Sequence, residues 1–128
     1  MAYTPNSQHR NSAFAGQKSQ WTINVPDEQN CYQASTSGNW SCGTYYWGLH
    51  VVGQALFGLG TSPQPVQETL HIAKFVGDAQ GNWHGYPVAP WLSPFDKPGE
   101  AVLKIWLNGG LIKKPTFSKI HRGKKCAL

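Results

Sequence analysis

Hydrophobic and polar positions alternate most regularly over residues 68–76, where the sequence reads ETLHIAKFV. A period of two is typical of a strand with one buried face. A polar turn bounded by glycines follows over residues 77–82, and a second alternating run over residues 83–88 contains Pro87. The pattern predicts a β-hairpin, and the missing amide hydrogen of Pro87 favours an edge position for the second strand.

A helical pattern is clearest over residues 98–108, where a wide apolar stripe is followed by two glycines. Pro98 suits the first turn of a helix, and Glu100 suits its positive end. A second helix is predicted over residues 47–58, because apolar residues recur there at helical spacing, although three glycines weaken the pattern.

Shorter elements complete the expected domain. Residues 21–25 predict a strand, residues 27–44 a turn-rich loop, and residues 111–120 one or two short strands. Residues 1–20 are rich in Ser, Asn, Gln and Gly, which predicts a flexible arm. We therefore expect a small single α+β domain over residues 21–128, with a mostly antiparallel sheet and two helices.

Composition supports a folded chain of one domain. The protein has 128 residues, of which 12% are aromatic and 13% charged, and six are tryptophans. A disordered chain would have few aromatic residues and many charges. Fourteen glycines and nine prolines argue against a helical bundle or a coiled coil.

Positive charge is concentrated at the C-terminal end. The net charge is +5, yet the first hundred residues carry four basic and six acidic groups, a net charge of −2. Such a block favours a polyanion such as nucleic acid, and the alternative is a solvated tail that aids solubility. The predicted nucleic-acid-binding residues are Lys113, Lys114, Lys119, His121, Arg122, Lys124 and Lys125.

Histidine and tyrosine are the candidate catalytic residues. His71 and His84 lie on the two strands of the predicted hairpin, and Tyr86 follows His84 on the same strand. Imidazole transfers protons at neutral pH, and tyrosine can act as an acid. The sequence contains no phosphate-binding loop and no zinc motif, so we expect neither a cofactor nor a metal.

The number of cysteines and the hydropathy of the chain indicate the cellular compartment of the protein. The chain has three cysteines, an odd number, and no apolar run long enough to act as a secretory signal or a membrane span. We expect a cytoplasmic protein with free thiols and no membrane partner. The alternative, a Cys31–Cys42 disulfide, would require an oxidising compartment.

Two functions of different classes remain open. The first is a domain that binds RNA or another single strand, in one form a metal-independent, toxin-like ribonuclease using histidine with lysine and arginine. The second is a non-enzymatic protein-interaction module of a larger assembly, with a tryptophan-rich surface buried against its partner. A basic cleft containing His84 would favour the first, and a large exposed apolar patch would favour the second.

Overall fold

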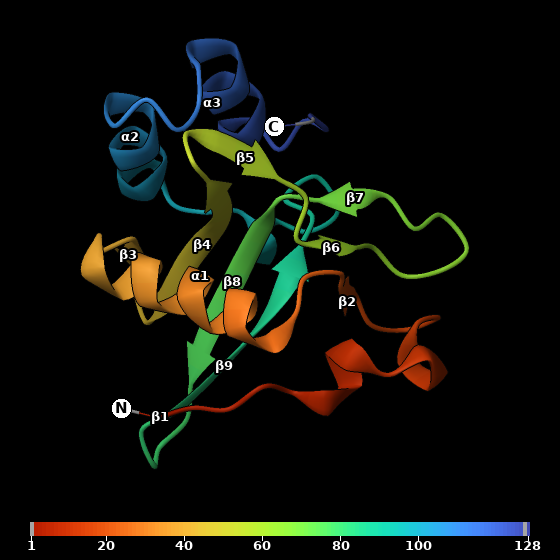
Figure 1. Cartoon of the computed structure of the whole chain (residues 1–128). Coiled ribbons are helices and arrows are strands. Elements are labelled where there is room, and N and C mark those ends of the chain that lie inside the picture. The colour runs from red at the N-terminus through yellow and green to blue at the C-terminus, as the bar shows by residue number, and fades with distance from the viewer. Residues whose placement is uncertain (1, 127) are drawn as a thin grey trace.

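A mostly antiparallel sheet forms the centre of the structure (Figure 1). The computed structural model describes residues 2–126 and residue 128. The strand order of the central sheet is β1-β9-β8-β4-β3, and β5 forms a hairpin with β4. Its strands are β1 (Ala2–Tyr3), β3 (Ser41–Cys42), β4 (Tyr45–Val52), β5 (Ala55–Phe57), β8 (Ile72–Gly77) and β9 (Asn82–Val88). A small second sheet has the order β2-β6-β7, with β2 (Gln20–Trp21), β6 (Gly60–Thr61) and β7 (Thr69–Leu70).

Helices cover both faces of the central sheet. On one face, α1 (Val25–Ser37) places Cys31 and Tyr32 in a core cluster with Phe75 of β8. On the other face, α2 (Glu100–Asn108) and α3 (Lys114–His121) pack in a second cluster that contains Ile72. Neighbouring residues of a strand point to opposite faces, so β8 contributes alternate side chains to the two cores.

Glycines make room for Phe75 in the first core. A Cβ atom on Gly85 of β9 would lie 2.2 Å from the Phe75 ring, and one on Gly48 of β4 would lie 2.7 Å from it. Both distances are too short for real carbon contacts, so these two neighbouring strands need glycine where the aromatic ring crosses them. On β9, His84 and Tyr86 flank Gly85 in the sequence. Because neighbouring residues of a strand point to opposite faces, both side chains lie on the face of the sheet away from Phe75.

The predicted α+β class is confirmed, and so are two of its main elements. The hairpin is formed by β8 and β9, with Lys74 opposite Tyr86 and Val76 opposite His84. Pro87 lies opposite Ala73, in the part of β9 beyond its short pairing with β1. The predicted helix at residues 98–108 corresponds to α2.

Four local predictions were wrong. The strand expected at residues 21–25 is limited to β2, which ends at Trp21, and Val25 already begins α1. The helix expected at residues 47–58 is the β4–β5 hairpin, in which Gly53 adopts a φ of +65° at the turn. The loop expected at residues 27–44 begins as part of α1, whose start is capped by the Asn24 side chain accepting from the Asp27 amide. The strands expected within residues 111–120 are replaced by α3. The structure thus has three α-helices among its described residues rather than two.

Residues 2–20, which belong to the segment predicted to be a flexible arm, pack against the rest of the domain. The arm contains β1 and two 3-10 helices, η1 (Ser7–Arg10) and η2 (Ser12–Phe14). His9 and Ala15 are buried, and the Thr4 amide donates to the Trp83 carbonyl over 2.8 Å. Arg10 forms an ion pair with Glu28 of α1 at 2.7 Å, and Glu28 is fully buried. These contacts hold the arm against β9 and α1.

None of the helices among the described residues is long and apolar enough to cross a bilayer. Cys31, Cys42 and Cys126 are unpaired, and burial raises the pKa of the Cys31 thiol to about 12.

Candidate functional site

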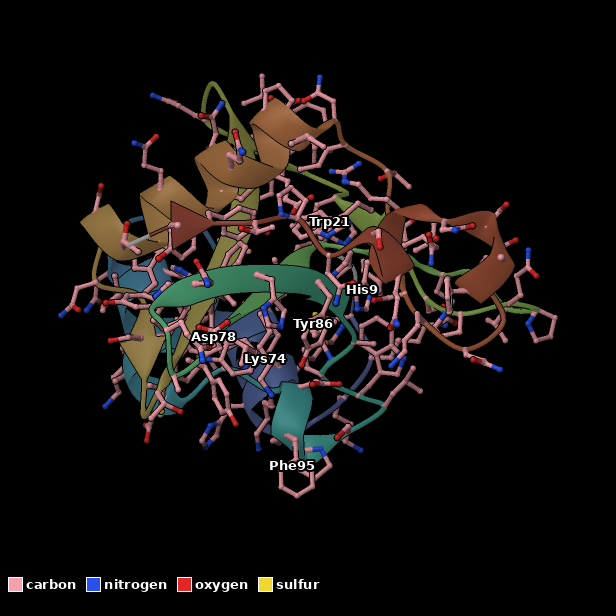
Figure 2. All side chains as sticks on the ribbon, turned by 90° about the horizontal axis from the view of Figure 1, so that it is seen from below. His9, Trp21, Lys74, Asp78, Tyr86 and Phe95 are labelled. Carbon is pink, nitrogen blue, oxygen red and sulfur yellow. The ribbon has the colours of Figure 1, made fainter. Side chains whose placement is uncertain are left out.

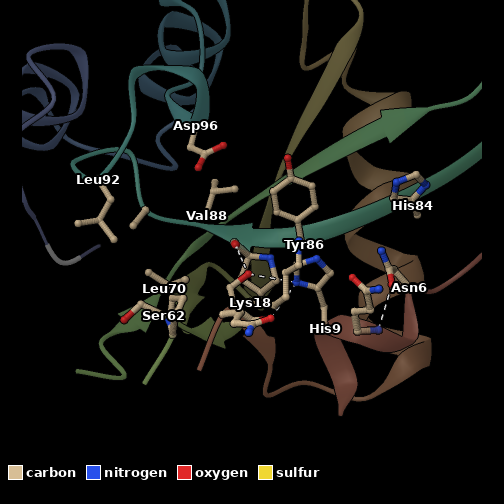
Figure 3. A pocket seen from close by; sticks show the side chains of 16 residues that line it. Asn6, His9, Lys18, Ser62, Leu70, His84, Tyr86, Val88, Leu92 and Asp96 are labelled. Atoms are coloured by element: carbon tan, nitrogen blue, oxygen red, sulfur yellow. Dashed lines mark hydrogen bonds between the residues drawn. The ribbon is translucent and has the colours of Figure 1, made fainter. Parts of the chain in front are cut away.

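A cavity of about 440 Å³ lies where the N-terminal arm meets β9 (Figure 3). Four segments that are distant in sequence form its walls: the arm, the chain from Ser62 to Leu70, strand β9 and the chain leading from β9 to α2. Its lining includes His9, Lys18, His84, Tyr86, Leu92 and Asp96. The cavity therefore contains two of the residues predicted to be catalytic, together with a histidine and a lysine from the arm.

Strand geometry brings His84 and Tyr86 to the same cavity. They are two positions apart on β9, and side chains at that spacing share a face. Figure 3 shows Tyr86 between Asp96 and His9, with His84 farther along the strand. The alternation that predicted the strand thus also accounts for this pair.

His9 is held in one orientation by a backbone hydrogen bond. Its Nδ1 lies 2.8 Å from the Ser19 carbonyl oxygen, which can only accept, so Nδ1 carries the proton. The Ser19 hydroxyl donates in turn to the Pro87 carbonyl over 2.7 Å, which ties this part of the arm to β9. In the neutral imidazole, a protonated Nδ1 leaves Nε2 with a free lone pair.

The surroundings of His9 favour its neutral form. Burial lowers the pKa of His9, and the charge of Lys18 and the nearby His84 ring lower it further, whereas the hydrogen bond to Ser19 opposes the change. An imidazole that is neutral at pH 7 and has an unprotonated Nε2 can accept a proton. His9 thus presents a nitrogen that can accept a proton at neutral pH.

Tyr86 contributes a neutral phenol beside this imidazole. Its ring stacks on the His9 ring with centroids 5.0 Å apart. Burial raises the pKa of Tyr86 to about 12, and the nearby Asp96 and Tyr45 contribute to the rise. Tyr86 therefore keeps its proton at neutral pH and can donate a hydrogen bond to a ligand.

A buried lysine fixes the wall of the cavity opposite the arm (Figure 2). The Lys74 Nζ donates to the Phe95 carbonyl over 2.7 Å, lies 3.6 Å from an Asp96 carboxylate oxygen and sits 4.3 Å from the Tyr45 ring centre. Burial raises the pKa of Asp96, and the charge of Lys74 opposes that rise. Lys74 thereby anchors η3 (Pro94–Asp96) beside Tyr86.

The third predicted catalytic residue, His71, lies elsewhere. It is half-buried between β7 and β8 and lines a separate, smaller cavity with Lys124 and Cys126. Burial lowers its pKa. The structure thus brings His84 together with His9 rather than with His71. The sequence carries no signal for His9, because its partners Ser19 and Tyr86 become neighbours only after folding.

The predicted nucleic-acid-binding residues are all exposed, and they are spread from the start of α3 to the chain beyond its end. Lys113 and Lys114 stand at the start of α3, and Arg122 stands just beyond its end. An eight-residue helix rises about 12 Å, which separates the two groups. Lys125 is paired with Glu68. The end of α3 near Arg122 is therefore the part of this segment that approaches the chain between β9 and α2.

Comparison with known proteins gave no match: no family model, no curated protein and no solved structure is significantly similar to the chain.

Proposed function

We propose that this protein binds single-stranded RNA in the cavity between the arm and β9 and cleaves it without a metal ion. The observation that carries the proposal is the presence of two imidazoles, His9 and His84, in one open cavity with Tyr86 and Lys18. Phosphodiester transfer without a metal needs a base, an acid and positive charge, and these four side chains can supply all three.

In the proposed reaction, His9 Nε2 removes the proton from a ribose 2′-hydroxyl. The 2′-oxygen attacks the adjacent phosphorus, and the bond from phosphorus to the 5′-oxygen of the next nucleotide breaks. His84 donates a proton to that leaving oxygen. The products are a 2′,3′-cyclic phosphate and a free 5′-hydroxyl, so the proton taken by one histidine is balanced by the proton given by the other.

Lys18 and Tyr86 would act on the phosphate itself. Negative charge grows on the non-bridging oxygens as the 2′-oxygen attacks, and fixed donors that face them lower the barrier. The Lys18 ammonium supplies a positive charge and the Tyr86 phenol a hydrogen bond. Because His9 stacks on Tyr86, a phosphate bound to the phenol would also lie near the proposed base.

The test is cleavage of a fluorescent RNA hexanucleotide in the presence of EDTA. We expect His9→Gln and His84→Gln each to lower kcat by about a hundredfold or more, the usual contribution of one general acid or base. The matched control is His50→Gln, since His50 lies on β4 and lines a different cavity. Activity that is absent from the purified protein, or that survives in both variants, would contradict the proposal.

The alternative function, a protein-interaction module, was expected to use a surface rich in tryptophan. None of the six tryptophans is among the exposed residues of the described chain, so a tryptophan-rich interface has little support. Exposed apolar side chains include Val66, Leu92 and Phe95, and three more lie on the β4–β5 hairpin, at Val51, Val52 and Phe57. Substitution of these three residues by Thr would leave RNA cleavage unchanged under the proposal made here.

A further inference from the structure

We propose that a second cavity, beside the first, binds the next phosphate of the same RNA strand, so that the protein acts on internal bonds of longer RNA. This inference rests on the proposed function of the first cavity. The second cavity has a volume of about 240 Å³ and lies between residues 90–94 and the end of α3. Trp91, Lys97 and Arg122 are among the residues that line it.

The two cavities adjoin at Leu92, which lines both. Leu92 is 64% exposed, so the boundary between the cavities is open to solvent. A strand bound at His9 and His84 can therefore continue across Leu92 without crossing a closed wall. Lys74 holds this segment in place from beneath through the Phe95 carbonyl.

The charge of the second cavity is not neutralised. Among the described residues, neither Lys97 nor Arg122 forms an ion pair with a carboxylate, whereas Lys104 is paired with Glu100 and Lys125 with Glu68. Lys97 Nζ donates to the His121 carbonyl over 2.9 Å, and Arg122 Nε donates to the Ser118 carbonyl over 3.3 Å. These backbone bonds orient the two cations but leave their positive charge available to a phosphate.

An exposed aromatic ring stands on the same segment. Phe95 is 81% exposed, and Figure 2 shows it projecting outward from the body of the protein. Exposing most of a phenyl ring to water is unfavourable for the free protein, and such rings serve as stacking platforms for unpaired bases. Phe95 lies two residues before Lys97 in the sequence, and a cation pair with an aromatic ring on the same segment fits a nucleotide of a single strand better than an isolated inorganic anion.

The first experiment compares binding of two RNAs made uncleavable by 2′-O-methyl groups, a dinucleotide and a hexanucleotide, by fluorescence anisotropy. We expect Arg122→Ala and Lys97→Gln each to weaken hexanucleotide binding by about tenfold, as for one lost charge-assisted hydrogen bond, with little effect on the dinucleotide. The matched control is Lys104→Ala, which removes one positive charge from a residue that lines neither cavity. Equal losses on both RNAs, or no loss, would overturn the second site.

The second experiment separates failure of this inference from failure of the proposed function. Unmodified dinucleotide and hexanucleotide are tested for cleavage, and we expect Arg122→Ala to raise KM for the hexanucleotide while leaving kcat nearly unchanged. If the wild-type protein binds the hexanucleotide through Arg122 but cleaves neither RNA, the catalytic proposal fails and the binding site stands. If it cleaves both RNAs equally well and Arg122→Ala changes neither, the binding site fails and the catalytic proposal stands.

Discussion

The imidazole ring of His9 stacks on the phenol ring of Tyr86, with their planes inclined by only 14°. The two residues belong to parts of the chain that are far apart in sequence, the N-terminal arm and the strand β9. Their contact makes the arm a wall of the candidate site. Any change that releases the arm should therefore affect both the stability of the protein and the site.

The first prediction concerns the ion pair that anchors the arm. Arg10→Met removes the guanidinium that faces the fully buried Glu28 carboxylate at 2.7 Å. An unpaired buried charge is costly, so we expect the free energy of unfolding to fall by about 3 kcal/mol. Chemical denaturation measures this change.

Lys104→Met is the matched control for Arg10→Met. Lys104 and Glu100 form an exposed i,i+4 pair on α2, and its loss should cost about 0.5 kcal/mol or less. A similarly small cost for Arg10→Met would mean that the arm contributes little to stability, as its polar composition predicts.

The second prediction concerns the pKa of His9. A positive charge nearby disfavours the imidazolium, so replacing Lys18 by Met should raise the pKa of His9. In the wild-type protein the pKa of His9 lies below its ordinary value of 6.5, and a base must be unprotonated to act. We therefore expect the acidic limb of the pH–rate profile to lie below pH 6.5 and to move to higher pH in Lys18→Met.

NMR titration of the His9 ring protons would measure the same shift without any assumption about activity. Lys113→Met serves as the control, because Lys113 stands at the start of α3 and does not line the cavity. A pKa of His9 at or above 6.5 in the wild-type protein would argue against its role as the base.

How far the sequence predicts this structure depends on how local the relevant contacts are. The β8–β9 hairpin and α2 follow from period and turn chemistry, which are properties of neighbouring residues. The β4–β5 hairpin does not, because its apolar residues also fit helical spacing and only pairing with β8 favours the strand. The orientation of His9 is least predictable, since Ser19, Pro87 and Tyr86 all contribute to it after folding.

The third prediction tests the core between the sheet and α2. Trp106 is fully buried and packs edge to face against Trp40, with ring centroids 5.8 Å apart. We expect Trp106→Ala to lower the free energy of unfolding by about 3–5 kcal/mol, as for other large buried aromatic residues. The adjacent Ile105 is 41% exposed, so Ile105→Ala should cost less than about 1 kcal/mol. Equal effects of the two changes would contradict the packing described here.

The last prediction uses salt to count the phosphates that the protein contacts. Each phosphate neutralised on a single strand contributes about −0.7 to the slope of log K against log salt. If all the basic residues of the C-terminal segment bound one strand, the slope would be steeper than about −3.5. The two cavities instead offer Lys18, Lys97 and Arg122, which gives a slope of about −2 and roughly a twentyfold loss of affinity when salt is raised fourfold.

Variants at the two ends of α3 distinguish binding along the whole basic segment from binding in the two cavities. Arg122→Ala should reduce the magnitude of the slope by about 0.7, because it removes one phosphate contact. Lys113→Ala should leave the slope unchanged, since Lys113 precedes the helix at the end remote from Arg122. A steep slope that falls equally in both variants would mean that the RNA lies along the whole of α3. Binding without any salt dependence would remove phosphate recognition altogether, and with it the assignment of both cavities to RNA.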